Sequence, residues 1–255
     1  MKDDCGYIEK TFAEVERQED IVFHTATNHL GAPEELRLDV TLPAEDARAK
    51  RRAILWIHGG GFRPGNDKQQ RYIVRIAGEF ARRGYVCFSC DYRVRENPMD
   101  DLAGTMRDAA DDCRAALAWI RTHAGQFGID GERVVVGGGS AGGMTAVNLC
   151  ALEATEGPSA GVPAIAALVN LWGSPFATDM LAEVDGRYPP TIIVHGTADA
   201  LVPHGNSEAL AATLERHGVR HQMILIEGAP HTPVTHMESF SDAIARFLAD
   251  VMPGC

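Results

Sequence analysis

The segment Val134–Met144, VVVGGGSAGGM, restricts the fold of this chain more than any other, because it sets one serine among five glycines. Glycine loses more conformational entropy on folding than any other residue, so a cluster of glycines is expected where side chains would not fit or where the backbone takes unusual angles. The three valines that precede the cluster favour a β-strand. The segment therefore predicts a buried strand that ends in a tight turn around the hydroxyl group of Ser140.

Predicted strands and helices alternate along most of the chain. Apolar runs and alternating patterns predict further strands at residues 36–42, 53–57, 85–93, 164–172, 191–196 and 222–228. Apolar positions at helical spacing predict helices over residues 73–81, 102–120, 141–154 and 240–251. This alternation indicates an α/β protein with a mostly parallel central sheet and helices on both faces, and we expect antiparallel pairing at its start.

We expect a single domain over residues 1–255, with residues 1–20 as a peripheral N-terminal segment. A chain of 255 residues suits one large α/β domain and is long enough to bury a core without disulfides. The sequence contains no internal repeat and no linker rich in proline, glycine or serine that would divide it.

Charge and composition argue against several classes of protein. The formal net charge of −11 disfavours a nucleic-acid partner or an anionic membrane surface, since both require basic patches. No apolar run reaches the roughly 18–20 residues of a transmembrane helix, and the N-terminus has no apolar stretch of the signal-peptide type. Six cysteines are too few for a disulfide framework in a chain of this length. We expect a cytoplasmic protein, or a secreted one if a signal peptide has been removed.

Ser140 has the surroundings of a catalytic nucleophile. Residues 138–142 fit the pattern G-x-S-x-G, in which a sharp turn between strand and helix holds the serine oxygen clear of the sheet. Glycines two positions before and after the serine leave room for neighbouring backbone. A dinucleotide-binding pattern, G-x-G-x-x-G, also fits Gly137, Gly139 and Gly142, so the turn alone leaves both interpretations open.

A second glycine run, HGGGF at residues 58–62, directly follows the predicted strand 53–57. Acyl transfer needs backbone amides that point at the oxyanion formed during the reaction, and glycines allow such amides to face a ligand. We predict that Gly60, Gly61 and Ala141 form this oxyanion hole, whereas His58 supports the loop. A dinucleotide site would leave this second run unexplained.

A serine nucleophile requires a base and an orienting acid. Asp199 and His231 each follow a predicted strand, and the chain order serine, aspartate, histidine is that of doubly wound hydrolases. We predict that these two residues complete a triad with Ser140. His236 remains an alternative base, and Glu227 an alternative acid. His195, at the end of a predicted strand, is interpreted as support for a loop.

These motifs together resemble the α/β-hydrolase superfamily over most of the chain. HGGGF, DYR at 91–93, GGGSAGG, HGTAD and GAPH are similar to those of carboxylesterases related to hormone-sensitive lipase, and of small acetyl-xylan and feruloyl esterases. The resemblance implies an α/β-hydrolase fold in which Ser140, Asp199 and His231 form the triad, beside the oxyanion hole named above. It implies no metal and no organic cofactor.

The sequence departs from hormone-sensitive-lipase relatives in two respects. Gly139 occupies the position before the serine, where those relatives usually have an acidic residue. Only a short connection separates Trp172 from Thr191, where they insert part of a helical cap. We therefore expect little or no cap domain and an open site. Phe62 and Trp172 are candidate walls of the substrate pocket, although packing in the core would explain each equally well.

The resulting hypothesis is a serine carboxylesterase that hydrolyses short-chain, aryl or sugar esters through an acyl-enzyme intermediate. Its partner is a small-molecule ester, and both a monomer and a homodimer are compatible with the sequence. One alternative is an amide or formamide hydrolase, similar to an arylformamidase, with the same triad. Another is a non-catalytic, receptor-like binding protein, but such proteins typically lose a triad residue.

Overall fold

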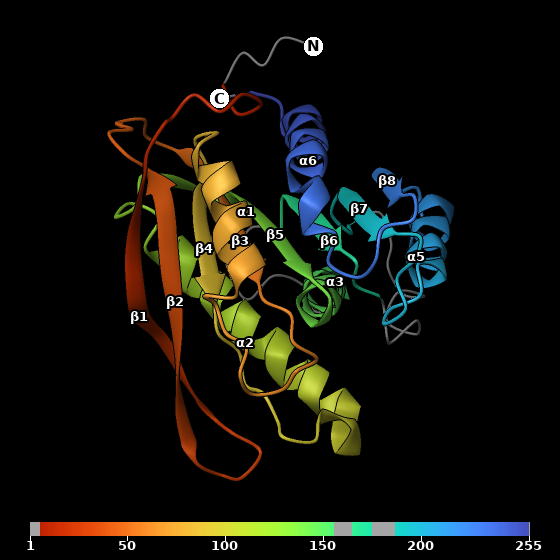
Figure 1. Cartoon of the computed structure of the whole chain (residues 1–255). Coiled ribbons are helices and arrows are strands. Elements are labelled where there is room, and N and C mark those ends of the chain that lie inside the picture. Colours follow the sequence, from red (N-terminus) through yellow and green to blue (C-terminus); the bar gives the residue numbers. More distant parts are fainter. Residues whose placement is uncertain (1–5, 156–164, 175–186, 255) are drawn as a thin grey trace.

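A computed structural model of the chain describes residues 6–155, 165–174 and 187–254. Its strands form one eight-stranded sheet in the order β1-β2-β4-β3-β5-β6-β7-β8 (Figure 1). The strands are β1 (Val15–Thr27), β2 (Pro33–Pro43), β3 (Arg51–Ile57), β4 (Val86–Cys90), β5 (Ile129–Gly139), β6 (Ala167–Leu171), β7 (Thr191–Gly196) and β8 (His221–Ile226). The helices are α1 (Arg71–Ala81), α2 (Leu102–Thr122), α3 (Ala141–Thr155), α5 (Gly205–Arg216) and α6 (Met237–Val251), with short 3₁₀ turns η1 (Pro98–Asp101) and η2 (Val234–His236).

The sheet is parallel from β4 to β8 and antiparallel at its start. Strand β3 pairs in parallel with β4 and β5, and the parallel pairing continues through β6 and β7 to β8. Strand β2 runs antiparallel to both β1 and β4. The predicted mostly parallel sheet is therefore confirmed, together with its antiparallel start.

Both faces of the sheet are covered by helices. All seven residues of β3 are buried, and successive side chains of a strand point to opposite faces. Leu55 and Ile57 belong to a cluster with apolar residues of α2, α3 and α5. Ile54 and Trp56 belong to a second cluster, with α1 and α6. The sheet is thus buried between two helical layers, which explains why its central strands are continuously apolar.

The N-terminal edge of the sheet contains a strand that the sequence analysis missed. Strand β1 forms a long hairpin with β2, and its first six residues come from the segment expected to be peripheral. Most β1 side chains are exposed, so the strand has no regular apolar signal. Tyr7, in the same N-terminal segment, is buried with its ring 4.8 Å from that of Tyr85.

Two expectations fall partly outside the described residues. The strand predicted for 164–172 corresponds to β6, but residue 164 is not described. The short connection between Trp172 and Thr191, from which we expect little or no cap, includes the undescribed residues 175–186. Helix α5, between β7 and β8, was not assigned a position from the sequence.

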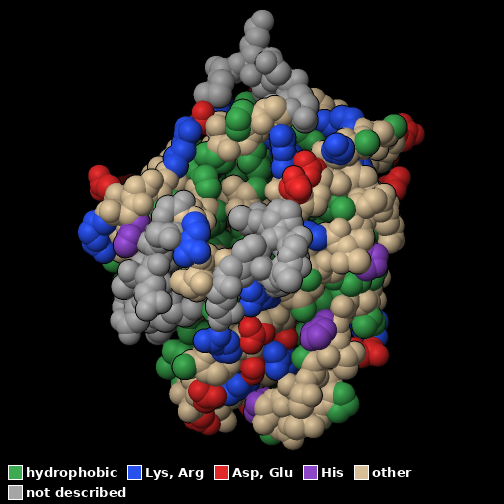
Figure 2. All heavy atoms as spheres, turned by 180° about the vertical axis from the view of Figure 1, so that it is seen from behind, with side chains coloured by type: hydrophobic (Ala, Val, Ile, Leu, Met, Phe, Trp, Pro, Cys, Tyr) green, Lys and Arg blue, Asp and Glu red, His purple; other side chains and the backbone are tan. Residues whose placement is uncertain are grey.

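The surface seen in Figure 2 mixes charges of both signs. Basic and acidic side chains lie interspersed on this face, around apolar side chains. Within the described residues, no helix is both long and apolar enough to cross a membrane.

The fold brings four loops to one edge of the sheet. The glycine loop follows β3, Ser140 follows β5, Asp199 lies just after β7 and His231 lies just after β8. In open α/β sheets, ligands bind at this carboxyl edge of the parallel strands. The site is built there.

Candidate active site

Ser140 lies between the last residue of β5 and the first residue of α3, with a φ of 58°. This left-handed conformation is unusual for a residue with a side chain, and such strain is concentrated at functional sites. The flanking glycines leave the necessary space: a Cβ at Gly138 would lie 2.5 Å from the carbonyl oxygen of Gly142, and one at Gly142 would collide with the Ile57 carbonyl oxygen. The strand-turn-helix around Ser140 therefore has the geometry predicted from G-x-S-x-G.

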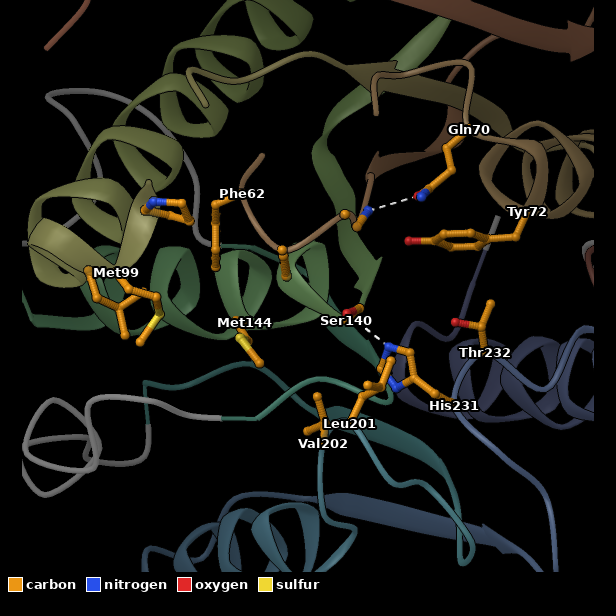
Figure 3. Close-up of a pocket in the computed structure, with 16 residues that line it drawn as sticks. Phe62, Gln70, Tyr72, Met99, Ser140, Met144, Leu201, Val202, His231 and Thr232 are labelled. Carbon is orange, nitrogen blue, oxygen red and sulfur yellow. Dashed lines mark hydrogen bonds between the residues drawn. The ribbon is translucent and has the colours of Figure 1, made fainter. Parts of the chain in front are cut away.

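Ser140, His231 and Asp199 form a continuous chain of hydrogen bonds. The Nε2 atom of His231 lies 2.9 Å from Ser140 Oγ, a contact drawn as a dashed line in Figure 3. The Nδ1 atom of His231 lies 2.6 Å from Oδ2 of Asp199. With Nδ1 donating to the carboxylate, Nε2 is free to accept the serine proton. The three residues predicted as a triad are thus brought together.

The carboxyl group of Asp199 is held in its ionised form. Its Oδ1 accepts hydrogen bonds from the amides of Leu201 and Val202, each at 2.9 Å. Burial alone would raise the pKa of Asp199, but the hydrogen bonds from His231 and these two amides outweigh it and lower the pKa below its usual range. Asp199 is therefore a fixed negative charge that orients the imidazole of His231.

A second histidine, His195, contacts the same carboxylate. Its Nε2 lies 3.0 Å from Oδ2 of Asp199 and 2.9 Å from the carbonyl oxygen of Val202. Both neighbours are acceptors here, so Nε2 carries a proton, while Nδ1 lies 2.7 Å from the hydroxyl of Ser207. Burial lowers the pKa of His195, which keeps the ring neutral. The sequence analysis missed this contact, although the four-residue spacing between the two residues in HGTAD is a signal for it.

The glycine loop is fixed by side chains from other elements. The amide of Gly59 donates to Oε1 of Gln70 at 2.9 Å. His58 is fully buried, stacks on the ring of Tyr92 with centroids 4.3 Å apart, and has Nδ1 2.8 Å from the carbonyl oxygen of Gly59. Burial lowers the pKa of His58 to about 4, so the ring is neutral near pH 7. These contacts match the supporting role expected for His58.

The residues predicted to form an oxyanion hole line the same cavity as Ser140. Gly60 and Gly61 line the same cavity as Ser140 and Ala141. The backbone is in positive-φ conformations at Gly60 and Gly61, at 110° and 63°. Ala141 is the first residue of α3, where backbone amides have no partner within the helix. All three residues thus line the cavity at Ser140, and their role as an oxyanion hole stays a prediction.

The cavity has a volume of about 470 Å³ and two chemically different sides (Figure 3). On one side of Ser140 lie Phe62, Met99 and Met144, which we call the apolar side. On the other side lie Gln70, Tyr72 and Thr232, which we call the polar side. The remaining lining residues are Gly59, Gly60, Gly61, Pro98, Leu102, Ala141, Leu201, Val202 and His231.

Two of the sequence-based alternatives and one candidate wall lie elsewhere. Trp172 is fully buried, with its ring 5.7 Å from that of Tyr72, and it does not line the cavity, in contrast to Phe62. His236 is exposed and has Nδ1 3.1 Å from the hydroxyl of Thr235. Glu227 is exposed. Among the described residues, neither His236 nor Glu227 is hydrogen-bonded to a triad residue.

The described part of the chain holds no group of three or more histidine, cysteine or acidic side chains suited to a metal ion. Its cysteines are buried free thiols, namely Cys87, Cys90, Cys113 and Cys150.

Two protein families match consecutive parts of the chain. The model of the family described as BD-FAE matches residues 38–167, just over half of the sequence, including the glycine loop and Ser140. The prolyl oligopeptidase family model matches residues 173–253, which include Asp199 and His231. The two matches divide the site between the serine and its acid–base partners.

Known esterases resemble the chain in sequence and structure. A probable isoprenylcysteine alpha-carbonyl methylesterase of Arabidopsis thaliana is 23% identical over 85% of this chain, which spans only about half (52%) of that relative's length. A thermophilic esterase from Thermogutta terrifontis is 26% identical, with a TM-score of 0.69 over 96% of this chain and 94% of its own. The same enzyme is known with propionate bound and phosphorylated by paraoxon, each at 25% identity and a TM-score of 0.69.

A carbohydrate esterase from gut microbiota has the same fold, with a TM-score of 0.73 over 95% of this chain and 98% of its own. Its sequence identity is 18%, so this likeness concerns the fold alone.

Proposed function

The chain belongs to the BD-FAE family of α/β-hydrolases, and from this premise we propose that it is a serine carboxylesterase with Ser140 as its nucleophile. The observation that supports this most strongly is the chain of hydrogen bonds from Ser140 through His231 to Asp199, next to a glycine loop. The Thermogutta terrifontis esterase that resembles this chain is phosphorylated by paraoxon, as is typical of enzymes with an activated serine.

The first half of the proposed reaction forms an acyl-enzyme. Oγ of Ser140 attacks the ester carbonyl carbon while Nε2 of His231 accepts the hydroxyl proton. The negative charge that develops on the carbonyl oxygen is stabilised by the amides of Gly60, Gly61 and Ala141. When the tetrahedral intermediate collapses, the bond to the alcohol oxygen breaks and His231 returns the proton to that oxygen. Asp199 stabilises the positively charged imidazole throughout.

The second half releases the acid. A water molecule attacks the acyl carbon, and His231 accepts its proton through the same nitrogen. The bond between the acyl carbon and Ser140 Oγ then breaks, and the proton passes from His231 to Oγ. The products are a carboxylic acid and the regenerated hydroxyl of Ser140, with no net change in the enzyme.

The cavity supports esters with short-chain or aryl groups as the substrate class. Its apolar side, with Phe62, Met99 and Met144, suits a hydrocarbon or aromatic group, and 470 Å³ lies within the range of small-molecule sites. The Thermogutta terrifontis esterase binds propionate, a short carboxylate of the kind that hydrolysis of the proposed esters would release.

Initial rates on p-nitrophenyl esters with acetyl, butyryl, octanoyl and dodecanoyl chains test this proposal. We expect the parent enzyme to hydrolyse the shorter esters, and Ser140→Ala to lower kcat by on the order of 10⁴–10⁶. A residual rate within tenfold of the parent would overturn the assignment of Ser140.

The amide alternative is tested on the same preparation with an N-formyl aniline and with the matching phenyl formate. The match of residues 173–253 to a peptidase family makes this comparison necessary. An esterase hydrolyses the formate ester far faster than the formamide. Comparable values of kcat/KM on both would instead favour an amide hydrolase with the same triad.

A further inference from the structure

Two arginines of α1 line a second hollow beside the catalytic cavity. Arg71 and Arg75 are four residues apart, so their side chains lie on the same face of the helix. With Val234 they help to line a hollow of about 330 Å³. The other lining residues are Gln70, Tyr72 and Thr232, and these three also form the polar side of the catalytic cavity. The two hollows therefore meet at a shared wall.

In the proposed mechanism, the alcohol leaves on the side of Ser140 where the shared wall lies. In the proposed mechanism, His231 returns its proton to the alcohol oxygen, so the alcohol must pass close to His231. Thr232 is the next residue in the chain and lies on this side in Figure 3, opposite Phe62 and Met99. Its φ of 57° is strained for a β-branched residue, so the position of the wall is tightly determined. In that mechanism the alcohol is directed towards the second hollow, which Arg71 and Arg75 line, and the acyl group towards the apolar side.

The charge of this hollow suits an anion. Arg71 and Arg75 are exposed, and within the described residues neither forms an ion pair with a carboxylate. Arg75 donates from Nη1 to the carbonyl oxygen of Val234 at 3.2 Å, a contact that joins α1 to η2 across the hollow. Two neighbouring guanidinium groups favour a carboxylate or phosphate, which accepts several of their hydrogen bonds at once.

We propose that Arg71 and Arg75 form a subsite for an anionic group on the alcohol part of the substrate. The natural substrate would then be an ester that joins an apolar acyl group to an alcohol bearing a carboxylate or a phosphate. This inference rests on the proposed esterase function, and it narrows the substrate class of the same site.

A pair of aryl acetates that differ only in charge tests the subsite. One acetate releases 3-hydroxybenzoate as its alcohol, and the other releases the neutral methyl ester of 3-hydroxybenzoate. The rate of spontaneous hydrolysis of each acetate corrects its enzymatic rate for the difference in leaving group. The test quantity is kcat/KM for the anionic acetate divided by kcat/KM for the neutral acetate. In the double variant Arg71→Gln/Arg75→Gln we expect this ratio to fall roughly tenfold, because each exposed charge contributes modestly to binding. Because this ratio divides out any change in rate that is common to both esters, it reports the effect of charge alone, and added NaCl should reduce the preference of the parent.

Arg82→Gln is the matched control, because it removes one positive charge at the opposite end of the same helix. We expect it to change the ratio by less than twofold, against roughly threefold for Arg71→Gln or Arg75→Gln alone. An unchanged ratio in the double variant would overturn the subsite. A loss confined to phenyl hydrogen succinate, which carries its charge on the acyl group, would overturn its assignment to the alcohol.

Failure of the esterase function gives a different result. If the parent hydrolyses neither acetate, the proposed function fails, and the subsite is decided by calorimetric titration with 3-hydroxybenzoate. The subsite requires the double variant to bind this anion more weakly than the parent and than Arg82→Gln. Equal affinities in all three proteins would contradict it.

Discussion

Two groups of residues next to Ser140, distinct from the apolar and polar sides of the cavity, differ in their chemistry. On the glycine side, which we define as the loop 58–61, the proposed oxyanion donors are backbone amides, whose directions depend on φ angles and on supporting contacts. On the acid–base side, which comprises His195, Asp199 and His231, the groups are side chains joined by hydrogen bonds. A single substitution can delete a side chain, whereas an amide can only be displaced, so the two sides should respond differently to mutation.

The two sides also differ in their access to solvent. His195 and Asp199 are buried, where hydrogen bonds between polar groups are strengthened by the low dielectric. Gly60 is half-buried and Gly61 is exposed, both at the wall of the cavity. The acid–base side is therefore a preformed network that is buried except at His231, and the glycine side is open to the cavity.

Among substitutions on these two sides, Asp199→Asn on the acid–base side is expected to have the largest effect. The amide would no longer provide a fixed negative charge and would favour the wrong tautomer of His231, so we expect kcat on p-nitrophenyl acetate to fall by on the order of 10⁴. Unfolding in urea should show that the variant is folded. A loss of less than tenfold would mean that Asp199 does not orient the base.

On the glycine side, Gly60→Ala should lower kcat by about 10²–10³, the usual effect of losing an oxyanion donor. Its φ of 110° lies outside the left-handed helical region, and an added Cβ would come within 2.5 Å of Asn66. Gly61→Ala is the matched control, because its φ is 63° and no atom lies within 4 Å of the added carbon. We expect Gly61→Ala to lose less than tenfold, and equal losses would contradict this account of the loop.

His58 should affect stability rather than the chemical step. The folded protein holds the pKa of this ring at about 4, below its ordinary value of 6.5, because the ring is buried. The unfolded chain therefore binds more protons between these pH values, and stability falls as the pH drops from about 6.5 towards 4. Between pH 7 and 4.5 we expect His58 to account for about 2–3 kcal/mol of lost unfolding free energy.

Urea unfolding of the parent and His58→Asn at both pH values measures this contribution. The variant should lose less stability on acidification than the parent, since asparagine does not titrate. Parallel losses in the two proteins would show that His58 is not held neutral by the fold.

A smaller effect than for Asp199→Asn or Gly60→Ala is expected from His195→Asn. Loss of the hydrogen bond from His195 to Asp199 should reduce kcat/KM roughly tenfold, as for bonds to charged groups. An unchanged kcat/KM would mean that the hydrogen bond from His195 does not support Asp199.

The features of the site that the sequence predicts are each marked by a short motif. The turn at Ser140 and the loop at 58–61 are each encoded by adjacent glycines, and the order of Ser140, Asp199 and His231 follows from strands that end at one edge. The missed features depend on contacts between distant segments. Exposed β1 has no apolar period, and the meeting of α1 with Thr232 and Val234 appears only once the chain is folded.

The same distinction, between short sequence motifs and contacts of distant segments, explains why only one of the two aromatic candidates is a pocket wall. Phe62 and Trp172 each follow a strand and have the same character in the sequence, but only Phe62 reaches the cavity. Trp172 packs against Tyr72 and Phe240 beneath the site, and this choice is made by tertiary packing.

The central claim is that Ser140 is an activated nucleophile, and covalent labelling tests it most directly. The parent protein and Ser140→Ala are incubated with a fluorophosphonate, and intact mass spectrometry with peptide mapping then locates the adduct. We predict a single adduct per chain on Ser140 of the parent, and none on the variant. An unlabelled parent, or equal labelling of both proteins, would contradict the account.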